Sequence, residues 1–255
     1  MRLRLRVRRD VCFWPRGGSV MPFCAICEQS VERWLADPQG TAHSSLLRVL
    51  EAVGADTDQH ICPGCGADDR ERHTWMYLAS TGVLDDTLGR RALHVGGEAR
   101  LREKLARLAI DWTFIEESEL DRLLRRSDAA HFHLIVCNRI LPTVTNVAAT
   151  IRSLAHALSD SGWLVAQSLY APMLKRTLAF TVEPTKRAAH LFFGSDRARR
   201  LFGSDFAQMF TLAGLQGGPY RHEDVLPGVD GATWGCNPRE PFFLFSRSRC
   251  LTSPS

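Results

Sequence analysis

The sequence predicts an α/β protein in which helices cover both faces of a parallel sheet, with a small metal-binding knuckle in front. From residue 92 onward, short apolar runs alternate with amphipathic stretches of helical period, which is typical of strand-helix units around a parallel sheet. Ahead of this region stand two Cys-x-x-Cys pairs, the spacing at which two thiolates from one turn bind a single ion.

The cysteine pairs predict a closed, structural Zn²⁺ site, with disulfides or reduced free thiols as the alternatives. The pairs are Cys24 with Cys27 and Cys62 with Cys65. In the run Cys62-Pro63-Gly64-Cys65-Gly66 the glycines allow a turn in which backbone N–H groups point at the sulfurs. The long interval between the pairs holds a predicted short helix over residues 44–53, ended by Gly54.

The predicted elements follow in order along the chain. Helices are expected over residues 68–78, 99–108, 118–126, 147–158 and 205–213, and strands over residues 92–95, 112–115, 133–137, 163–166 and 241–246. Sheets of this type bind ligands beyond the carboxyl ends of their strands, so the loops after the strands are the first place to look for a site.

Length and composition limit the possible roles. The 255 residues suffice for one α/β domain with an appendage. We expect residues 1–20 to be a disordered or mis-assigned extension, 21–80 the zinc-binding knuckle and linker helix, and 81–250 the main domain. The net charge of +4 is mostly arginine and partly in the first sixteen residues, which argues against nucleic-acid binding. No apolar stretch approaches a membrane span, and the scattered remaining cysteines predict a reducing cytoplasm. The oligomeric state stays open.

Several runs occur in the same order as in a group of bacterial methyltransferase-domain proteins with an N-terminal cysteine knuckle. They are residues 62–66, 70–72, 75–78, 93–98, 134–138, 158–165 and 200–206. The chain from residue 60 to 246 therefore resembles the class I S-adenosylmethionine-dependent methyltransferase superfamily. The resemblance implies a Rossmann-like sheet of seven strands and S-adenosylmethionine as the cofactor.

The resemblance also implies cofactor-binding residues. In this family the loop after the first strand passes close to the methionine part of the cofactor, and here Gly96 and Gly97 occupy that loop, followed by Glu98. The fuller glycine-rich run is absent, and an ordinary strand-to-helix turn is the alternative. A carboxylate at the end of the second strand would accept hydrogen bonds from the ribose hydroxyls, a role that suits Glu116 or Glu117, although acids are also common at helix starts.

The residues for chemistry are less defined. Asn138 follows the third strand and is able to hydrogen-bond a cofactor ammonium or a substrate, but no obvious general base follows it. The candidates on the substrate side are Tyr170, His190, His222 and Glu223, each of which is also explained as a surface or packing residue. The arginines at positions 197, 199 and 200 are candidates for holding an anionic acceptor.

Three function classes follow from these observations. The first is a methyltransferase acting on a small molecule or on a carrier-bound or peptide intermediate, with specialised metabolism as one setting. The second uses the same cofactor for aminocarboxypropyl transfer or cyclisation. The third is a non-catalytic, zinc-containing interaction protein with a methyltransferase fold. RNA methylation fits less well, since the knuckle lacks a dense basic and aromatic pattern.

Overall fold

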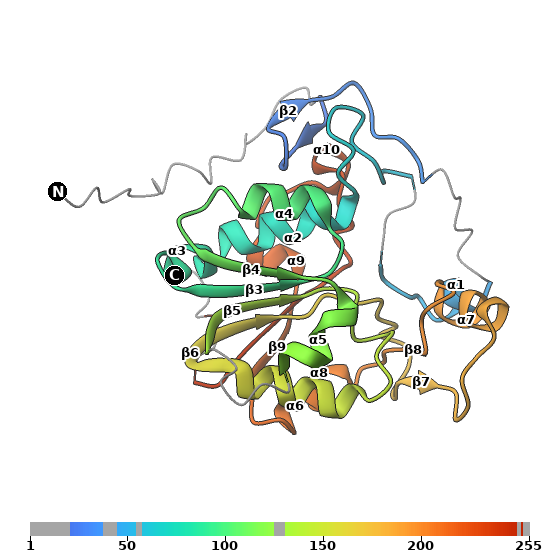
Figure 1. The fold of residues 1–255 in the computed structure, drawn as a ribbon. Helices are drawn as coiled ribbons and strands as arrows, with labels where there is room; N and C mark the ends of the chain where they lie inside the picture. Colours follow the sequence, from blue (N-terminus) through green and yellow to red (C-terminus); the bar gives the residue numbers. More distant parts are fainter. Residues whose placement is uncertain (1–20, 38–44, 55–57, 125–130, 249–250, 252–255) are drawn as a thin grey trace.

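The computed structural model describes residues 21–37, 45–54, 58–124, 131–248 and 251. The extension expected over residues 1–20 lies outside these residues. A central six-stranded sheet separates two layers of helices (Figure 1). Among the described residues, no helix is both long enough and apolar enough to span a bilayer.

The strand order of the central sheet is β4-β3-β5-β6-β10-β9. The strands are β3 (Arg91–Val95), β4 (Asp111–Ile115), β5 (Phe132–Cys137), β6 (Leu158–Val165), β9 (Gln216–Tyr220) and β10 (Phe242–Ser246). Strand β3 pairs in parallel with β4 and β5, β5 pairs in parallel with β6, and β10 runs antiparallel to both β6 and β9. The α/β sheet with helices on both faces that the sequence predicts is confirmed, although the sheet is mixed and only mostly parallel. Its strand order is consistent with a Rossmann-like methyltransferase fold.

The expectation of seven strands needs correction, because the described residues form six strands in this sheet. The missing strand would belong between α5 (Glu117–Leu124) and β5. Only residues 125–131 separate these elements, and a further parallel strand with its crossover needs about a dozen residues. In the part of the chain that the structure describes, β4 is therefore the edge strand.

The buried strands are apolar on both faces, as a sheet covered on both sides requires. Every residue of β5 and β10 is buried. Along β10, Phe242 and Leu244 join one apolar cluster while Phe243 and Phe245 join the other, because successive side chains of a strand point to opposite faces.

Helices α2 (Asp69–Ser80), α3 (Val83–Thr87) and α4 (Ala99–Leu105) pack on the first face, where α9 (His222–Val225) and α10 (Gly231–Trp234) also lie (Figure 1). Helices α5, α6 (Val147–Ala157) and α8 (Phe206–Thr211) cover the second face. The short strands β1 (Phe23–Cys24) and β2 (Gln29–Ser30) carry the first cysteine pair, and the apolar residues around both pairs belong to the same cluster as α2.

A small third cluster lies to one side of the sheet (Figure 1). It is built from α1 (Ser45–Val49), β7 (Leu178–Ala179), α7 (Lys186–Phe193) and β8 (Arg200–Leu201). Backbone hydrogen bonds between Val53 and Tyr170 join this lobe to the chain that leaves β6. The helix predicted between the cysteine pairs is therefore present as α1.

Candidate metal centre and cofactor crevice

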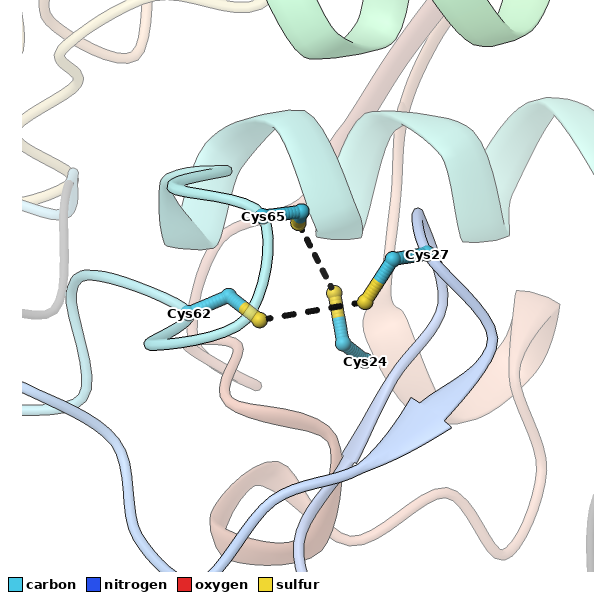
Figure 2. A group of neighbouring side chains, drawn as sticks. All are labelled: Cys24, Cys27, Cys62 and Cys65. Carbon is cyan, nitrogen blue, oxygen red and sulfur yellow. Dashed lines mark hydrogen bonds between the residues drawn. The ribbon is translucent and has the colours of Figure 1, made fainter.

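The four paired cysteines meet at one point beside α2 (Figure 2). Their sulfur atoms all lie within 4.8 Å of one another, with Cys24 Sγ 3.8 Å from Cys65 Sγ and Cys27 Sγ 3.9 Å from Cys62 Sγ. A tetrahedral ion with metal–sulfur bonds of about 2.3 Å places its sulfurs about 3.8 Å apart. None of these cysteines is in a disulfide, so the group fits a four-coordinate metal ion. We call it the metal centre.

Both Cys-x-x-Cys loops form the same turn. The Glu28 N–H donates to the Cys24 carbonyl at 2.8 Å, and the Gly66 N–H donates to the Cys62 carbonyl at 2.9 Å. Glu28 and Gly66 both have left-handed backbones, with φ of 60° and 77°. Glycine adopts this conformation freely, whereas Glu28 adopts it at a conformational cost. Two equivalent turns thus present two pairs of sulfurs to a common point.

Burial affects the protonation of the cysteine thiols. Burial raises the pKa of Cys24 well above its ordinary value, and the neighbouring thiolates add to the effect. Burial likewise raises the pKa of Cys65 to about 11. At Cys62 burial also acts upward, but hydrogen bonds from the Cys65 and Gly64 backbone outweigh it, and the pKa is lowered. A bound divalent ion would supply the charge that turns all four thiols into thiolates.

Basic side chains lie around the metal centre. Lys104 is 8% exposed, and its Nζ donates to the Ile26 carbonyl at 3.0 Å and to Glu28 Oε1 at 2.6 Å. A hollow of about 350 Å³ beside Cys27 and Cys65 is lined by Arg100, Lys104 and Arg107, with Glu103 among them. A divalent ion with four thiolates carries a net charge of about −2, which these cations partly offset.

Arg72 joins the metal centre to the C-terminal part of the chain. This side chain is fully buried and stacks over the ring of Trp34 at 4.1 Å. Its guanidinium donates to the carbonyls of Ala67 at 2.7 Å, Gln59 at 2.6 Å and Gly235 at 2.6 Å. The Ala67 carbonyl also accepts the Cys62 N–H. One buried guanidinium therefore links the second cysteine turn to the segment after α10.

The candidate cofactor crevice, by which we mean the region beyond the carboxyl ends of β3, β4 and β5, is located by strand order. The chain passes from β3 to β4 on one side and then returns to place β5 on the other side, so the topological switch point lies between β3 and β5. Ligands of open α/β sheets bind outside the carboxyl ends of the strands at this point. Val95 pairs with Ile115 and with Cys137, so the residues that follow these three positions lie at one edge. They are Gly96, Glu116 and Asn138.

The glycine loop has the space and conformation that a close ligand requires. Gly96 has a φ of 129°, which L side chains rarely adopt. A Cβ at Gly97 would have Glu116 Oε2 as its nearest neighbour, at 3.9 Å. The side chain of Glu116 is 56% exposed and accepts a hydrogen bond from Arg102 at 3.2 Å. The glycine loop and the carboxylate that the sequence predicts as cofactor-binding residues are therefore adjacent.

Glu98 points into the protein from the same loop. Its side chain is 2% exposed, and its Oε2 lies 3.1 Å from His94 Nε2. Among the described residues, none donates a well-aligned hydrogen bond to Oε2. The Glu98 Oε1 accepts from the Asn138 amide at 3.4 Å and lies 3.8 Å from Arg139 Nε. Glu98 Oε2 is therefore a buried acceptor without a well-aligned donor among the described residues.

A second carboxylate, absent from the sequence prediction, lies beside the crevice. Glu71 Oε1 accepts the backbone N–H groups of Arg100 and Leu101, the first free donors of α4, at 2.8 and 3.0 Å. Its Oε2 accepts the Asp68 N–H, which completes a capping box on α2. The Asp68-x-x-Glu71 spacing signals the capping box, whereas the contact with α4 depends on tertiary structure. The N-terminus of α4 is thus occupied by a protein carboxylate.

Asn138 is held by the backbone and by α2. Its Oδ1 accepts the Gln167 N–H at 3.2 Å, and its amide donates to Thr74 Oγ1 at 3.3 Å. Arg139 follows with a left-handed backbone, φ 60°, and donates to Asp68 Oδ2 at 3.1 Å. The end of β5 is therefore fastened to the start of α2, the helix that leaves the metal centre.

The candidate catalytic residues do not converge. Tyr170 is half-buried against Phe243, and burial raises its pKa. His190 is exposed on α7, and Glu223 is exposed and paired with Arg221. His222 is buried and hydrogen-bonded to His73, and burial lowers its pKa to about 4. The described residues therefore gather no set of these four side chains around one acceptor position.

The arginine cluster divides between structural and surface roles. Arg200 is buried, and it donates to the carbonyls of Leu141 and Val144 at 2.6 and 2.7 Å. Arg197 pairs with Glu117, and with Arg199 it lines a groove of about 520 Å³ between α5 and α6. Only the latter two arginines are placed to meet a ligand.

No protein family and no curated protein matches the sequence. Among solved structures, the chain is similar to the CcbJ methyltransferase from Streptomyces caelestis, with 16% identity over 72% of this chain and 92% of that chain and a TM-score of 0.45. It is also similar to the sugar N-methyltransferase KedS8 from a Streptoalloteichus species, with 15% identity over 73% and 90% of the two chains and a TM-score of 0.45. The similarity to the cyclase SpnF has 14% identity over 57% and 58% and a TM-score of 0.37. The fold assignment itself depends on the strand order described above.

Proposed function

We propose that this protein binds S-adenosylmethionine at the switch point between β3 and β5 and transfers its methyl group to a small-molecule, carrier-bound or peptide acceptor. The observation that carries the proposal is the adjacency of the Gly96–Gly97 turn to the exposed Glu116 carboxylate at the end of the neighbouring strand. A carboxylate there is suited to accept hydrogen bonds from two ribose hydroxyls.

The other residues of the crevice have complementary roles in this proposal. Gly96 and Gly97 allow the backbone to approach the cofactor, and Glu98 with Asn138 offers oxygen acceptors to its ammonium group. The bound cofactor supplies an activated methyl group on a positively charged sulfur. The chain then has to align the acceptor with the methyl group and exclude water. Alignment by itself accounts for a large part of the rate enhancement in such reactions.

For the metal centre we propose Zn²⁺ in a structural role, since four thiolates fill all positions of a tetrahedral ion and leave none open for chemistry. All six described cysteines are free of disulfides, which supports a reducing compartment such as the cytoplasm. Cys62→Ser is expected to lose the ion of this site and to be less stable, by metal analysis and thermal unfolding. A variant that is fully stable without the metal would refute the structural role.

Calorimetric titration with S-adenosylhomocysteine tests the cofactor proposal. We expect a dissociation constant in the micromolar range, and about tenfold or greater weakening in Glu116→Ala. Glu103→Ala is the matched control, because its side chain has the same 56% exposure but lies in α4, away from the crevice. No heat and no thermal shift with the unmodified protein would overturn the proposal. After turnover, S-adenosylhomocysteine as the product identifies methyl transfer and excludes aminocarboxypropyl transfer.

One observation favours a second candidate, a non-catalytic zinc-containing scaffold. Glu71 occupies the N-terminus of α4, and Glu98 lies among His94, Asn138 and Arg139, so protein groups occupy much of the polar space behind the glycine loop. This candidate predicts no binding of S-adenosylhomocysteine together with full retention of the metal, the opposite result in the same titration.

A further inference from the structure

Three buried side chains form a second cluster of potential metal ligands on the first face of the sheet. They come from α2, α9 and the turn after α10, which lie on the same side of the sheet (Figure 1). His73, His222 and Cys236 each place one ligand atom within 4.8 Å of the other two, and the three residues are 1%, 4% and 0% exposed. Two imidazoles and a thiol are the donor types that borderline-soft ions such as Zn²⁺ select.

The far nitrogens of both histidines lie near acceptors. His222 Nε2 is hydrogen-bonded to the Val229 carbonyl at 3.1 Å, whereas His73 Nδ1 lies 3.5 Å from Glu240 Oε2 without a well-aligned hydrogen bond among the described residues. A carboxylate or a backbone carbonyl at the distal nitrogen is the usual second contact of a metal-bound histidine, because it fixes the tautomer and orients the ring. The near nitrogens, His73 Nε2 and His222 Nδ1, lie 2.9 Å apart, and Cys236 is the third member of the group.

The charges in this buried region suit a divalent ion. A Cys236 thiolate and the Glu240 carboxylate, which is 3% exposed, would together offset the two positive charges. The Tyr77 hydroxyl donates to the Glu240 backbone carbonyl at 2.5 Å, and the Tyr77 ring stacks on His73 with centroids 4.2 Å apart. Glu240 and His73 are thus held in place by a common neighbour.

We propose that His73, His222 and Cys236 form a second site, separate from the metal centre, for a zinc-class divalent cation. The ion binds His73 Nε2, His222 Nδ1 and Cys236 Sγ, with a fourth position for a water molecule. It takes the place of the hydrogen bond between His73 Nε2 and His222 Nδ1, which lie 2.9 Å apart. The nitrogens move apart to about 3.3 Å, the separation on a tetrahedral zinc ion. The site cross-links α2 to the segment over residues 222–236.

The test is the zinc content of the purified full-length chain. We expect about two zinc ions per chain, and about one after Cys236→Ala. Cys137→Ala is the matched control, because Cys137 is also 0% exposed but lies in β5 in the other apolar cluster, and this variant keeps both ions. A single zinc ion in the unmodified protein, or equal zinc content in the two variants, overturns the proposal.

A second measurement on the unmodified chain decides the matter even if Cys236→Ala does not fold. In protein loaded with Co²⁺, a histidine ligand gives paramagnetically shifted N–H resonances that disappear in heavy water. We expect such signals from His73 Nδ1–H and His222 Nε2–H, the two positions that face Glu240 and Val229. The four-cysteine centre gives none, so their absence would show that the histidines share only a hydrogen bond.

Discussion

Replacing Arg72 with alanine is predicted to destabilise the protein severely. The guanidinium makes five hydrogen bonds to backbone carbonyls: two to Gly235, at 3.0 and 2.6 Å, and one each to Ala67, Gln59 and His60, at 2.7, 2.6 and 3.3 Å. Trp34 covers it on one side. Alanine removes all the guanidinium donors and leaves these four carbonyls beside a cavity, where the Ala67 carbonyl still accepts the Cys62 N–H.

The expected cost follows from these contacts. A buried carbonyl that loses its only donor costs about 1–3 kcal/mol, and the values do not add fully because water enters the cavity. Loss of one buried, hydrogen-bonded charged group typically costs about 3–5 kcal/mol. We expect a loss in this range, a large share of the roughly 5–15 kcal/mol that stabilises a typical domain. Arg72→Lys keeps the positive charge but lacks the planar guanidinium, so we expect a smaller decrease in the free energy of unfolding than in Arg72→Ala.

The assay is equilibrium urea unfolding in the presence of excess zinc, so that metal loss does not contribute. Arg122→Ala is the matched control, since its side chain is 80% exposed and, among the described residues, pairs with Glu119 on its own helix. The control should change the free energy of unfolding by less than about 0.5 kcal/mol. A change of less than about 1 kcal/mol in Arg72→Ala would refute the role assigned to this residue.

Three further predictions concern the crevice. Gly96→Ala should lower the free energy of unfolding by about 1–2 kcal/mol because of its φ of 129°, while Gly97→Ala, whose φ is not in that region, should leave it nearly unchanged in urea unfolding. Glu71→Gln should cost about 1–3 kcal/mol, because an amide offers one acceptor oxygen where the carboxylate uses two; unchanged amide exchange at the start of α4 would contradict this. Burial alone would raise the pKa of Asp68, but the charge of Arg139 and a backbone N–H hold it below 3.8. Its contribution to stability is therefore complete above that value and lost below it, so acid unfolding below about pH 4 should be steeper in the unmodified protein than in Asp68→Asn.

The helices and strands of the main domain that were predicted from periodicity are present, but some of their ends differ. The strand predicted over residues 163–166 begins at Leu158, and the end of the helix predicted over residues 118–126 lies outside the described residues. Strand β9 was not predicted, since Gly217, Gly218 and Pro219 read as a turn. It forms because β10 supplies a complete row of backbone partners, and a Cβ at Gly217 would collide with the Leu244 carbonyl. The glycine that weakens the local signal is thus required by the sheet.

The sequence by itself was enough to predict the four-cysteine group, the alternation of strands and helices and the position of the glycine turn. Each of these features comes from a local pattern with a fixed period or spacing. Only the tertiary structure decided which side chains serve distant elements. Glu71 caps a helix other than its own, Arg72 bonds to a loop far along the chain, and His73 meets His222. Such contacts join residues whose separation carries no period, so a single sequence contains no local signal for them.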